Sequence, residues 1–402
     1  MEIARETARR LTIEKQRFGP RKKPVRKEDI LETVIALGCI QIDTINVIER
    51  AHYVTLWSRL GNYDKEHLHQ LAYEDRLITE GWAHAASYIP LEDYRYFLHR
   101  MNIRRAGMED YIRRRAKTDP EILGRVLERI KAEGPLATKD FESKREEPSK
   151  GWWSWKPAKV ALEALFAAGT LMISHRENFQ RHYDLTERVL PPWVDTSEPS
   201  EEDRIRFFAL RTMGCLGLIK ASDIRKYYHH WSISLGRTSK QLQATLEELT
   251  DNDEAIEFRL EGERQPHYCT PEDADRIQRL ANGDPSYEGV SLLTNFDNLL
   301  WNREKTESLF GFQPKLEVYL PAEQRKYGYY NLPILHGHSL VGRIVPKMDR
   351  KNKTLIVHSI WHEPGFEPDE IYKDAFKETL EDFAAFNGAD QVQMEEERPR
   401  IG

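Results

Sequence analysis

The segment Leu37–Ile45, LGCIQIDTI, carries the residues best suited to chemistry. Apolar and polar residues alternate along it, and in an extended chain successive side chains point to opposite faces. Ile40 and Ile42 are therefore expected to point into a core, while Gln41 and Asp43 share the other face. An amide beside a carboxylate could position a water molecule and stabilise a cationic transition state.

This interpretation depends on an extended backbone. On a helix, residues two apart diverge by about 200° and could not act together. A Gln-x-Asp triplet is also a weak signal by itself, because such triplets arise by chance. The alternative is structural: the Asp43 carboxylate would cap a backbone amide in a turn.

The elements expected around this segment recur three times as a weak internal repeat of helix, short helix, third helix and two strands. The middle copy is the clearest. Its first helix, Glu121–Ala132, has apolar residues on one face, and Thr138 can cap the short second helix. Its third helix, Ala158–Ala168, begins after Pro157, and two strand-like runs follow in LMISHRENFQRHYDLT. This order is typical of a winged helix, a variant of the helix-turn-helix.

The other two copies follow the same order with almost no sequence identity. The third copy has predicted helices at Asp203–Met213, Asp223–His229 and Lys240–Leu249, then strands in AIEFRLEGERQPHYCT. The first copy has predicted helices at Lys27–Leu37 and His67–Glu74, then strands in RLITEGWAHAASYIP. The repeat is thus inferred from pattern, and an unrelated helical bundle with added hairpins is the alternative.

The composition changes after Gly289. The runs KLEVYLP, YGYYNLPILHG, SLVGRIVPKMD and TLIVHSIWHEP alternate apolar and polar residues, which predicts an antiparallel sheet, and Tyr372–Phe386 predicts a closing helix. The expected fold class is α+β, with three winged helices and a C-terminal β-rich domain. The predicted domains are 1–118, 119–196, 197–288 and 289–402. Without βαβ alternation or a glycine-rich phosphate loop, a dinucleotide-binding or P-loop fold is disfavoured.

Charge is distributed unevenly along the 402 residues. The net charge of −6 and pI near 6.2 do not indicate a nucleic-acid-binding protein. However, Met1–Lys27 has ten basic and three acidic residues, Arg95–Lys131 has eleven and five, and Glu367–Gly402 has four and eleven. This asymmetry favours a basic working face and an acidic tail. The alternative is that these runs are solvated helix faces.

The remaining composition indicates a globular protein with 40% hydrophobic and 31% charged residues. No run approaches the roughly 20 apolar residues of a membrane span, and the charged N-terminus does not resemble a secretory signal. Cys39, Cys215 and Cys269 lack the paired spacing of a zinc site and are expected to be buried small hydrophobes. The sequence therefore predicts a cytoplasmic protein with no metal or other cofactor.

Several long strings resemble one bacterial family. Residues 38–64, GCIQIDTINVIERAHYVTLWSRLGNYD, resemble the YcaQ/AlkZ-like winged-helix DNA glycosylases that unhook DNA interstrand crosslinks. Further similar strings are WAHAAS at 82–87, NFDNLLWNRE at 295–304, LFGF at 309–312, RKYGYYNLPILHG at 325–337 and GRIVPKMDR at 342–350. The resemblance covers nearly the whole chain and is weakest over 119–195.

The resemblance implies three winged helices that form a concave channel for duplex DNA, backed by the β-rich domain. Family members carry Gln-x-Gln or Gln-x-Asp as the catalytic motif, and this chain has the second form in Gln41 and Asp43. The Gln-x-Asp branch is the broader one, acting on N7-alkylguanine adducts and nitrogen-mustard-type crosslinks. The implied protein is a bacterial monomer that associates with the nucleoid when it is bound to DNA carrying alkylated or crosslinked purines.

The chemistry of such a substrate fits the two residues. An N7-alkylated purine is positively charged and leaves readily, so the catalyst must stabilise an oxocarbenium-like sugar and deliver water. Asp43 could serve as stabiliser and base, and Gln41 could hold the water. The motif contains no lysine, so a Schiff-base lyase step is not indicated and a monofunctional glycosylase is expected.

Other residues could contact DNA, and each has a structural alternative. Arg59 and Asp64 could reach phosphate and the site, or could form structural ion pairs. His84 could reach a lesion pocket, or could be a wing histidine with satisfied hydrogen bonds. Phosphate contacts are also expected from Arg303, Arg325, Tyr329 and Arg343, and base stacking or core packing from Trp152, Trp153 and Trp155.

A second function fits the same fold. Winged helices most often belong to non-catalytic transcription regulators. A regulator is usually a short dimeric chain that reads a palindrome, whereas this chain has three copies and a large extra domain. That organisation favours a monomer that wraps a lesion.

Overall fold

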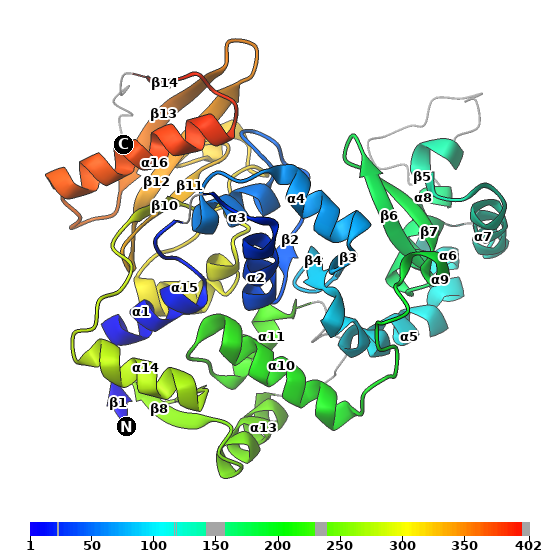
Figure 1. The fold of residues 1–402 in the computed structure, drawn as a ribbon, viewed down its shortest axis with the longest axis horizontal. Helices are drawn as coiled ribbons and strands as arrows, with labels where there is room; N and C mark the ends of the chain where they lie inside the picture. The colour runs from blue at the N-terminus through cyan, green and yellow to red at the C-terminus, as the bar shows by residue number, and fades with distance from the viewer. Residues whose placement is uncertain (22–23, 116, 118, 142–156, 230–238, 396–402) are drawn as a thin grey trace.

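The computed structural model describes residues 1–402 except 22–23, 116, 118, 142–156, 230–238 and 396–402. The described chain is a mixed α+β fold with three three-stranded sheets and one five-stranded sheet. Each small sheet belongs to one helical unit. In Figure 1 the first unit lies at the centre, and the five-stranded sheet and the second unit lie on opposite sides of it.

The first unit contains the Gln-x-Asp segment. Its elements are α2 (Lys27–Leu37), β2 (Ile40–Gln41), α3 (Ala51–Leu60), α4 (Lys65–His69), a π-helical turn (Gln70–Glu74), β3 (Ile78–Trp82) and β4 (Ala86–Pro90). The predicted helix at 27–37 and the predicted hairpin are confirmed. The sequence analysis did not predict α3, all ten of whose residues are buried.

The second unit follows a helical connection made of a 3-10 helix (Leu91–Phe97), α5 (Leu98–Ala106) and α6 (Met108–Arg115). Its elements are α7 (Glu121–Glu133), β5 (Leu136–Ala137), a 3-10 turn (Thr138–Phe141), α8 (Pro157–Ala167), β6 (Leu171–Glu177), β7 (Gln180–Leu185) and α9 (Thr186–Val189). The predicted elements of this copy are confirmed to within a few residues.

The third unit is built from α10 (Glu201–Leu216), α11 (Ala221–Tyr227), α13 (Ser239–Asp251), β8 (Ile256–Leu260), β9 (Pro266–Cys269) and α14 (Pro271–Ala281). It also holds the start of the chain. Strand β1 (Glu2–Ile3) pairs with β8, and α1 (Arg5–Lys15) packs on α10 and α14. The sequence assigned this N-terminal segment to the first unit, but Thr12 and Gln16 donate hydrogen bonds to backbone carbonyls of the third.

The three units share one strand topology. In each, the short strand before the second helix pairs with the last strand of the hairpin: Ile40 with Tyr88, Leu136 with Tyr183, and Ile219 with Tyr268 through an isolated bridge. The hairpin in turn pairs antiparallel within itself. This common topology accounts for the internal repeat that the sequence showed only as a pattern.

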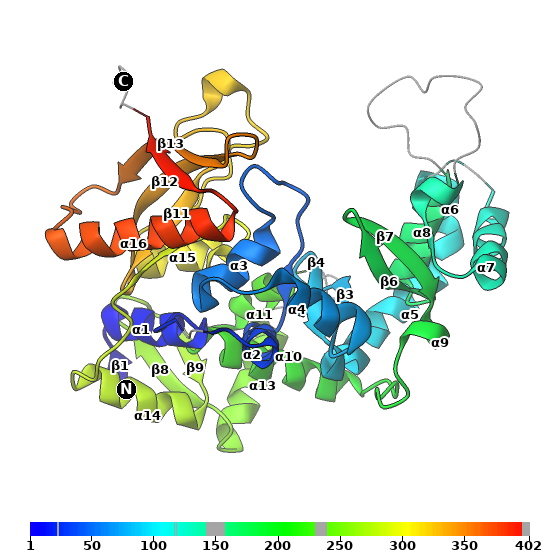
Figure 2. The ribbon, with the colours of Figure 1, turned by 45° about the horizontal axis from the view of Figure 1, so that its top comes forward.

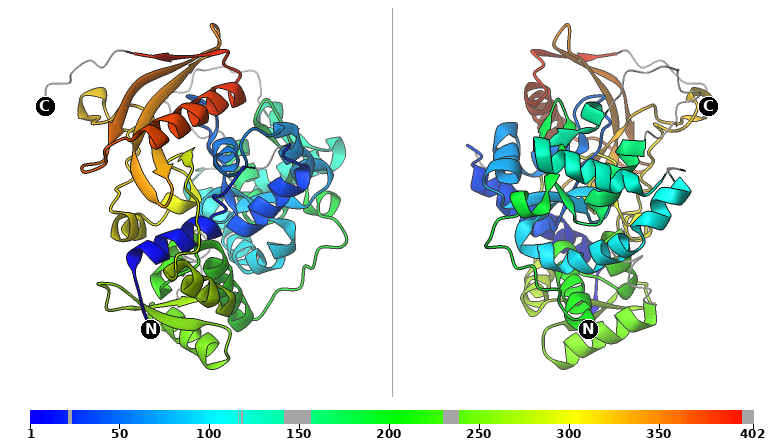
Figure 3. Two further views of the ribbon diagram at one scale, coloured as in Figure 1. Left: turned by 60° about the vertical axis from the view of Figure 1, so that its left-hand side comes forward. Right: turned by 90° about the vertical axis from the view of Figure 1, so that its right-hand side faces the viewer.

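The C-terminal part forms the five-stranded sheet, in the order β10 (Val290–Leu292), β11 (Leu332–His336), β12 (Ser339–Asp349), β13 (Thr354–His362) and β14 (Gln391–Met394). The pairs are antiparallel except for β14, which runs parallel to β13. The helical segments are a 3-10 turn (Asn298–Leu300), α15 (Arg303–Phe310), a second 3-10 turn (Ala322–Gln324) and α16 (Glu370–Phe386), which confirms the predicted closing helix. Figure 3 shows this sheet and the third unit at opposite ends of the molecule, with α1 between them.

One predicted strand is wrong. Lys315–Pro321, KLEVYLP, forms no strand despite its alternating pattern. The carboxylate of Glu317 is buried and accepts hydrogen bonds from the backbone amides of Lys326, Tyr327 and Gly328, at 3.1, 2.8 and 3.0 Å. These bonds hold the segment as a compact loop. The Glu317 carboxylate accepts the backbone hydrogen bonds that a neighbouring strand would accept in a sheet.

A buried carboxylate joins the second unit to the first. Glu80 on β3 pairs with Arg176, at 2.6 and 2.7 Å, and with Arg181, at 3.1 Å, on the β6–β7 hairpin. Tyr73 donates a further hydrogen bond of 2.8 Å. Burial alone would raise the pKa of Glu80, but the two arginines lower it to about 2. The carboxylate is therefore ionised and fixes the hairpin against the first unit.

The three cysteines are buried and free, as the sequence predicted. No helix in the described ranges is long and apolar enough to cross a membrane.

Candidate active site

Strand β2 holds the Gln-x-Asp segment in the extended form that the sequence required. Ile40 and Gln41 pair with Tyr88 and Ser87 of β4, and the Ile42 amide donates a 2.7 Å hydrogen bond to the carbonyl of Ala86. Ile40 and Ile42 are buried, while Gln41 and Asp43 are partly exposed. The alternation of faces is thus observed.

A glycine makes the turn from α2 into β2 possible. Gly38 has φ +70°, and a Cβ built there would lie 2.3 Å from the Tyr228 hydroxyl oxygen. Any side chain would therefore meet both backbone strain and a collision with the side chain of Tyr228, the C-cap residue of α11. The close approach keeps the third unit directly behind the strand.

Buried polar side chains fix the strand from behind. The Asn298 amide donates hydrogen bonds to the Cys39 carbonyl at 2.7 Å and to the Tyr227 hydroxyl at 2.9 Å. That hydroxyl donates to the Leu37 carbonyl at 2.8 Å. Asn298 follows the C-terminal strand β10 and Tyr227 ends α11, so two other parts of the chain hold the backbone just before Gln41.

The loop after Asp43 is held from the front. Arg350, at the end of β12, donates to the side chain of Asn46 and to the carbonyl of Ile48, both at 2.8 Å. Figure 2 shows this loop between β2 and α3 beside the C-terminal sheet. The Gln-x-Asp segment is therefore fixed on both sides by residues far from it in sequence.

The Asp43 carboxylate is half buried and carries one clear hydrogen bond. Its Oδ1 accepts from the Ile45 amide at 2.7 Å, which is the turn-capping role that the sequence offered as the alternative. Burial raises the pKa of Asp43 above its ordinary value, and hydrogen bonds from the amides of Ile45 and Thr44 oppose this. No described cation pairs with it. Its charge acts on Tyr330: burial, with a smaller contribution from Asp43, raises the pKa of that phenol to about 12.

Gln41 and Asp43 are both available to a substrate. No side chain in the described part of the chain hydrogen-bonds to either residue, although the strand beneath them pairs with β4. A cation that approaches a half-buried, unpaired carboxylate stabilises the negative charge of that carboxylate. An amide beside it can both donate and accept a hydrogen bond.

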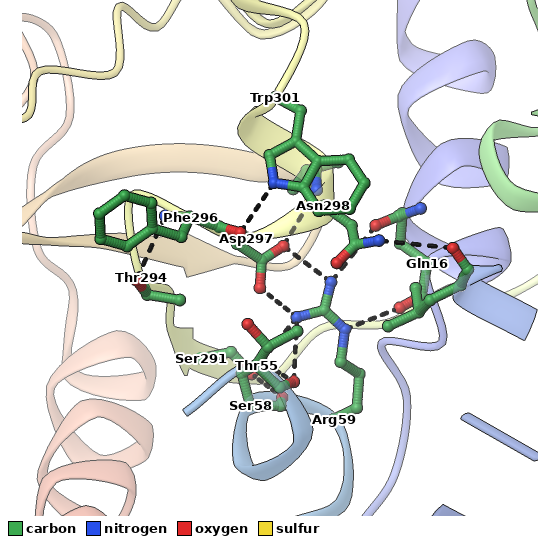
Figure 4. Close-up of polar contacts among 12 residues, drawn as sticks. Gln16, Thr55, Ser58, Arg59, Ser291, Thr294, Phe296, Asp297, Asn298 and Trp301 are labelled. Atoms are coloured by element: carbon green, nitrogen blue, oxygen red, sulfur yellow. Dashed lines mark hydrogen bonds and ion pairs between the residues drawn. The ribbon is translucent and has the colours of Figure 1, made fainter. Parts of the chain in front are cut away.

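Arg59 is a structural residue, which corrects its predicted DNA contact. Its side chain is fully buried and forms a bidentate pair with Asp297, with Nη2 and Oδ1 2.8 Å apart. Nε donates to the Gln16 carbonyl at 3.0 Å, Nη1 donates to the Ser58 hydroxyl at 2.7 Å, and the guanidinium lies over the ring of Phe18. Figure 4 shows these contacts closing around the guanidinium.

Arg343 is also buried and does not face solvent, so its predicted phosphate contact is wrong. Its guanidinium lies between the rings of Phe312 and Tyr327, at 4.2 and 4.1 Å from the centroids. It pairs with Glu363 at 2.9 Å and donates to the Gln313 carbonyl at 2.8 Å. All of its donors point to the interior of the C-terminal part.

Asp64 and His84 both make structural contacts, although that of Asp64 is a helix cap and not the ion pair that was its alternative. Asp64 caps α4 by accepting from the Glu66 amide at 2.9 Å. His84 stacks on Trp301, with ring centroids 4.2 Å apart, and its Nδ1 lies 3.1 Å from the Tyr227 carbonyl. Burial lowers the pKa of His84 to about 4, so the ring is neutral at neutral pH.

Three of the predicted contacts lie at the surface. Arg303 is exposed at the start of α15 and forms no ion pair with a described residue. Arg325 lies 4.8 Å from the ring centroid of Tyr329, which is 46% exposed. These side chains can still reach a phosphate. Trp152, Trp153 and Trp155 lie outside the described residues.

The residues that sequence reasoning missed are Asn298 and Tyr330. Both lie in strings that carried the family resemblance, NFDNLLWNRE and RKYGYYNLPILHG. The strings were visible, but nothing local indicated that they would pack behind and beside the Gln-x-Asp segment. Among the described residues, no three His, Cys, Asp or Glu side chains gather as metal ligands would.

Comparisons with known proteins agree on one family. The sequence model of a family described as "DNA glycosylase AlkZ-like" matches residues 34–386. A solved structure of the Streptomyces sahachiroi DNA glycosylase AlkZ is similar to this chain with a TM-score of 0.65. It covers 98% of this chain and 100% of its own, at 16% sequence identity. At that identity the likeness shows a shared fold.

The buried pair predicts a large stability effect at Asp297. Replacing Asp297 with Ala leaves the Arg59 guanidinium buried and unpaired, which typically costs about 3–5 kcal/mol. We expect urea unfolding to show a loss of this size. Glu32→Ala, which removes the exposed partner of Arg17, is the control and should leave the unfolding midpoint almost unchanged. Equal losses in the two variants would contradict the role of the pair.

Proposed function

The chain belongs to the AlkZ-like family of DNA glycosylases, and from this premise we propose that it hydrolyses the N-glycosidic bond of N7-alkylated purines with Gln41 and Asp43 as the catalytic residues. The observation that carries the proposal is the pair itself. Two polar side chains without side-chain partners stand on a backbone that residues from three parts of the fold hold in place. Such support is what a preorganised catalytic group requires.

The proposed mechanism starts from the charge of the substrate. An N7-alkylated purine leaves as a neutral base, and positive charge develops on the sugar as the bond breaks. The Asp43 carboxylate stabilises that charge and accepts the proton of the attacking water, while the Gln41 amide orients the water. The products are the free base and an abasic sugar. The segment 37–45 contains no lysine that could form a Schiff base, so the proposed enzyme is monofunctional.

The three repeated units are proposed to be winged helices that bind duplex DNA. Their common strand topology supports this assignment, as does the order of helices before each hairpin. The proposed phosphate contacts are Arg303 and Tyr329, which are exposed, and Arg325, which is partly exposed. The proposed domain divisions are those of the sequence, with residues 1–16 reassigned to the third unit because they pack there.

The substrate range is proposed to include bulky and crosslinked N7 adducts. A base tied covalently to the opposite strand cannot rotate out of the duplex without its partner, so an enclosed base pocket would exclude it. Gln41 and Asp43 stand on the rim of a sheet and are partly exposed, so they could reach a sugar from outside the helix. The proposed enzyme therefore acts on a base that stays in the duplex.

Comparing two lesions tests the substrate range. We expect the protein to release N7-methylguanine from a duplex and also to unhook a nitrogen-mustard crosslink, because neither needs base extrusion. Base release is measured by alkaline cleavage of the abasic site, and unhooking by denaturing electrophoresis. If bulk at N7 abolishes activity, an enclosed pocket exists and the proposal of an open site fails.

Asp43→Asn tests the catalytic assignment. The asparagine oxygen can still accept from the Ile45 amide, so the loop should keep its conformation while the charge is lost. We expect excision of N7-methylguanine to fall by about 10²–10⁴-fold, the usual worth of a positioned acid or base. Gln41→Ala should reduce excision less, because the amide orients the water but carries no charge.

The matched control is Asp253→Asn, the same change at an exposed turn residue with positive φ, which should excise at the parental rate. Parental excision by Asp43→Asn would show that another residue is the catalytic carboxylate. Tight binding of one undamaged palindrome without base release would instead favour the transcription regulator.

The pH dependence follows from the burial of Asp43. Only the ionised carboxylate can stabilise the sugar cation, and burial raises its pKa above the ordinary aspartate range. The rate should therefore fall with decreasing pH through that raised pKa, at a higher pH than for a solvent-exposed aspartate. Single-turnover excision rates from pH 4 to 8, corrected for spontaneous depurination, measure this pH dependence. The residual rate of Asp43→Asn should lack the fall towards acidic pH. An identical fall in both would contradict the assignment.

A further inference from the structure

A cleft of 1090 Å³ lies between the loop that follows Asp43 and the C-terminal sheet. Its walls include Tyr327, Tyr329, Tyr330, Lys347, Arg350 and Trp361. Pockets that bind one small molecule usually measure about 300–1,000 Å³, so this cleft has room for a larger ligand. The proposed hydrolysis does not account for it, and of the phosphate contacts proposed above only Tyr329 lines it.

The cleft begins beside the proposed catalytic residue. Asn46 and Val47, which line it, follow Asp43 by only three and four residues. Tyr330 lines it as well, and the charge of Asp43 acts on that phenol. A ligand in the cleft would therefore lie next to a sugar that reacts at Asp43.

Aromatic rings form one part of the wall. Tyr329 is 46% exposed, and its ring lies beneath the Arg325 guanidinium. Tyr327 meets Trp361 edge to face, with centroids 5.8 Å apart and planes at 83°. Because the rings of Tyr327 and Trp361 are nearly perpendicular, they can present faces to separate flat groups.

Basic side chains surround these rings. Lys347 is exposed on β12 and forms no ion pair with any described residue. Lys315 and Lys326 lie 5.9 and 5.1 Å from the ring centroid of Tyr327. The acidic residue of the cleft, Glu395, pairs with His358 at 2.8 Å. The cleft therefore favours an anionic ligand with flat apolar faces.

We propose that this cleft binds an unpaired stretch of DNA strand next to the lesion, so that the preferred substrates are adducts where duplex meets single strand. This inference rests on the proposed glycosylase function and extends it to the DNA around the damaged base. Stacking on aromatic side chains with cations along the backbone is the usual way of binding single strands without sequence preference. In a duplex the base faces are covered by their neighbours, so these rings could not stack on them.

The binding of undamaged oligothymidylate tests the proposal without any base excision. Fluorescein-labelled octathymidylate is titrated with the full-length protein, and fluorescence anisotropy gives Kd over a range of salt concentrations. We expect Tyr329→Ala to raise Kd at least about fivefold, the effect of one lost stacking contact. Lys347→Ala should reduce the slope of log K against log salt by about 0.7, the value for one phosphate contact on a single strand.

Matched variants separate stacking and charge from general damage. Tyr329→Phe keeps the ring and loses only the hydroxyl, so it should keep most of the affinity that Tyr329→Ala loses. Lys373→Ala removes an exposed lysine on α16 and should leave the salt slope unchanged. With 5-iodouracil in the strand, photo-crosslinks should map to the peptides that carry residues 327–330 or 361. Equal weakening by Tyr329→Phe and Tyr329→Ala, or photo-crosslinks that map only to other peptides, would overturn the proposal.

The two proposals fail separately. If the protein binds the single strand as expected but releases no N7-methylguanine, the assigned catalysis is wrong and the cleft stands. If it releases the base yet the cleft variants bind octathymidylate like the parent, the cleft proposal is wrong and the catalysis stands.

Discussion

The buried pair of Arg59 and Asp297 is the interaction on which the arrangement of the site depends. It joins α3 of the first unit to the segment that follows β10, and Gln16 connects the same guanidinium to the end of α1. Removing two charges from water is costly, and the geometry offsets this because each donor of the guanidinium has an acceptor. The two hydrogen bonds of a bidentate pair also require a particular orientation of the two side chains, which apolar packing does not. It therefore fixes how the N-terminal, first and C-terminal parts of the chain meet.

The position of the Gln-x-Asp segment follows from the way these three parts of the chain pack together. Asn298 is the residue after Asp297. The Arg59–Asp297 pair therefore also positions the Asn298 side-chain amide, which donates to the Cys39 carbonyl. From the other side, Arg350 holds the loop after Asp43. A two-residue strand has too few hydrogen bonds of its own to fix a functional group, and the distant residues supply the remaining constraint.

Glu80, which is buried, and Asp43, which is half buried, show how the surroundings of a carboxylate set its pKa. Burial acts on Glu80 and Asp43 in the same direction, raising the pKa of each. Around Glu80 two arginines reverse the effect, so this residue is a permanent anion that holds the second unit in place. Asp43 has only backbone amides as partners and keeps a raised pKa. A carboxylate held this way gains most from a cation that forms nearby, which is what hydrolysis of a glycosidic bond provides.

The sequence by itself determined the features that depend on local periodicity. The alternation of Ile40 to Asp43 predicted the two faces of the strand, and apolar spacing predicted α7 and α16. Tertiary structure decided which charged residues are buried. Arg59, Arg343 and Arg325 are all basic residues within family-like strings. Arg59 is nevertheless buried against Asp297 and Arg343 against Glu363 and Gln313, each at least 20 residues away, whereas Arg325 stays partly exposed beside Tyr329. Burial of a charge depends on which distant acceptors fold against it, and no local pattern records that.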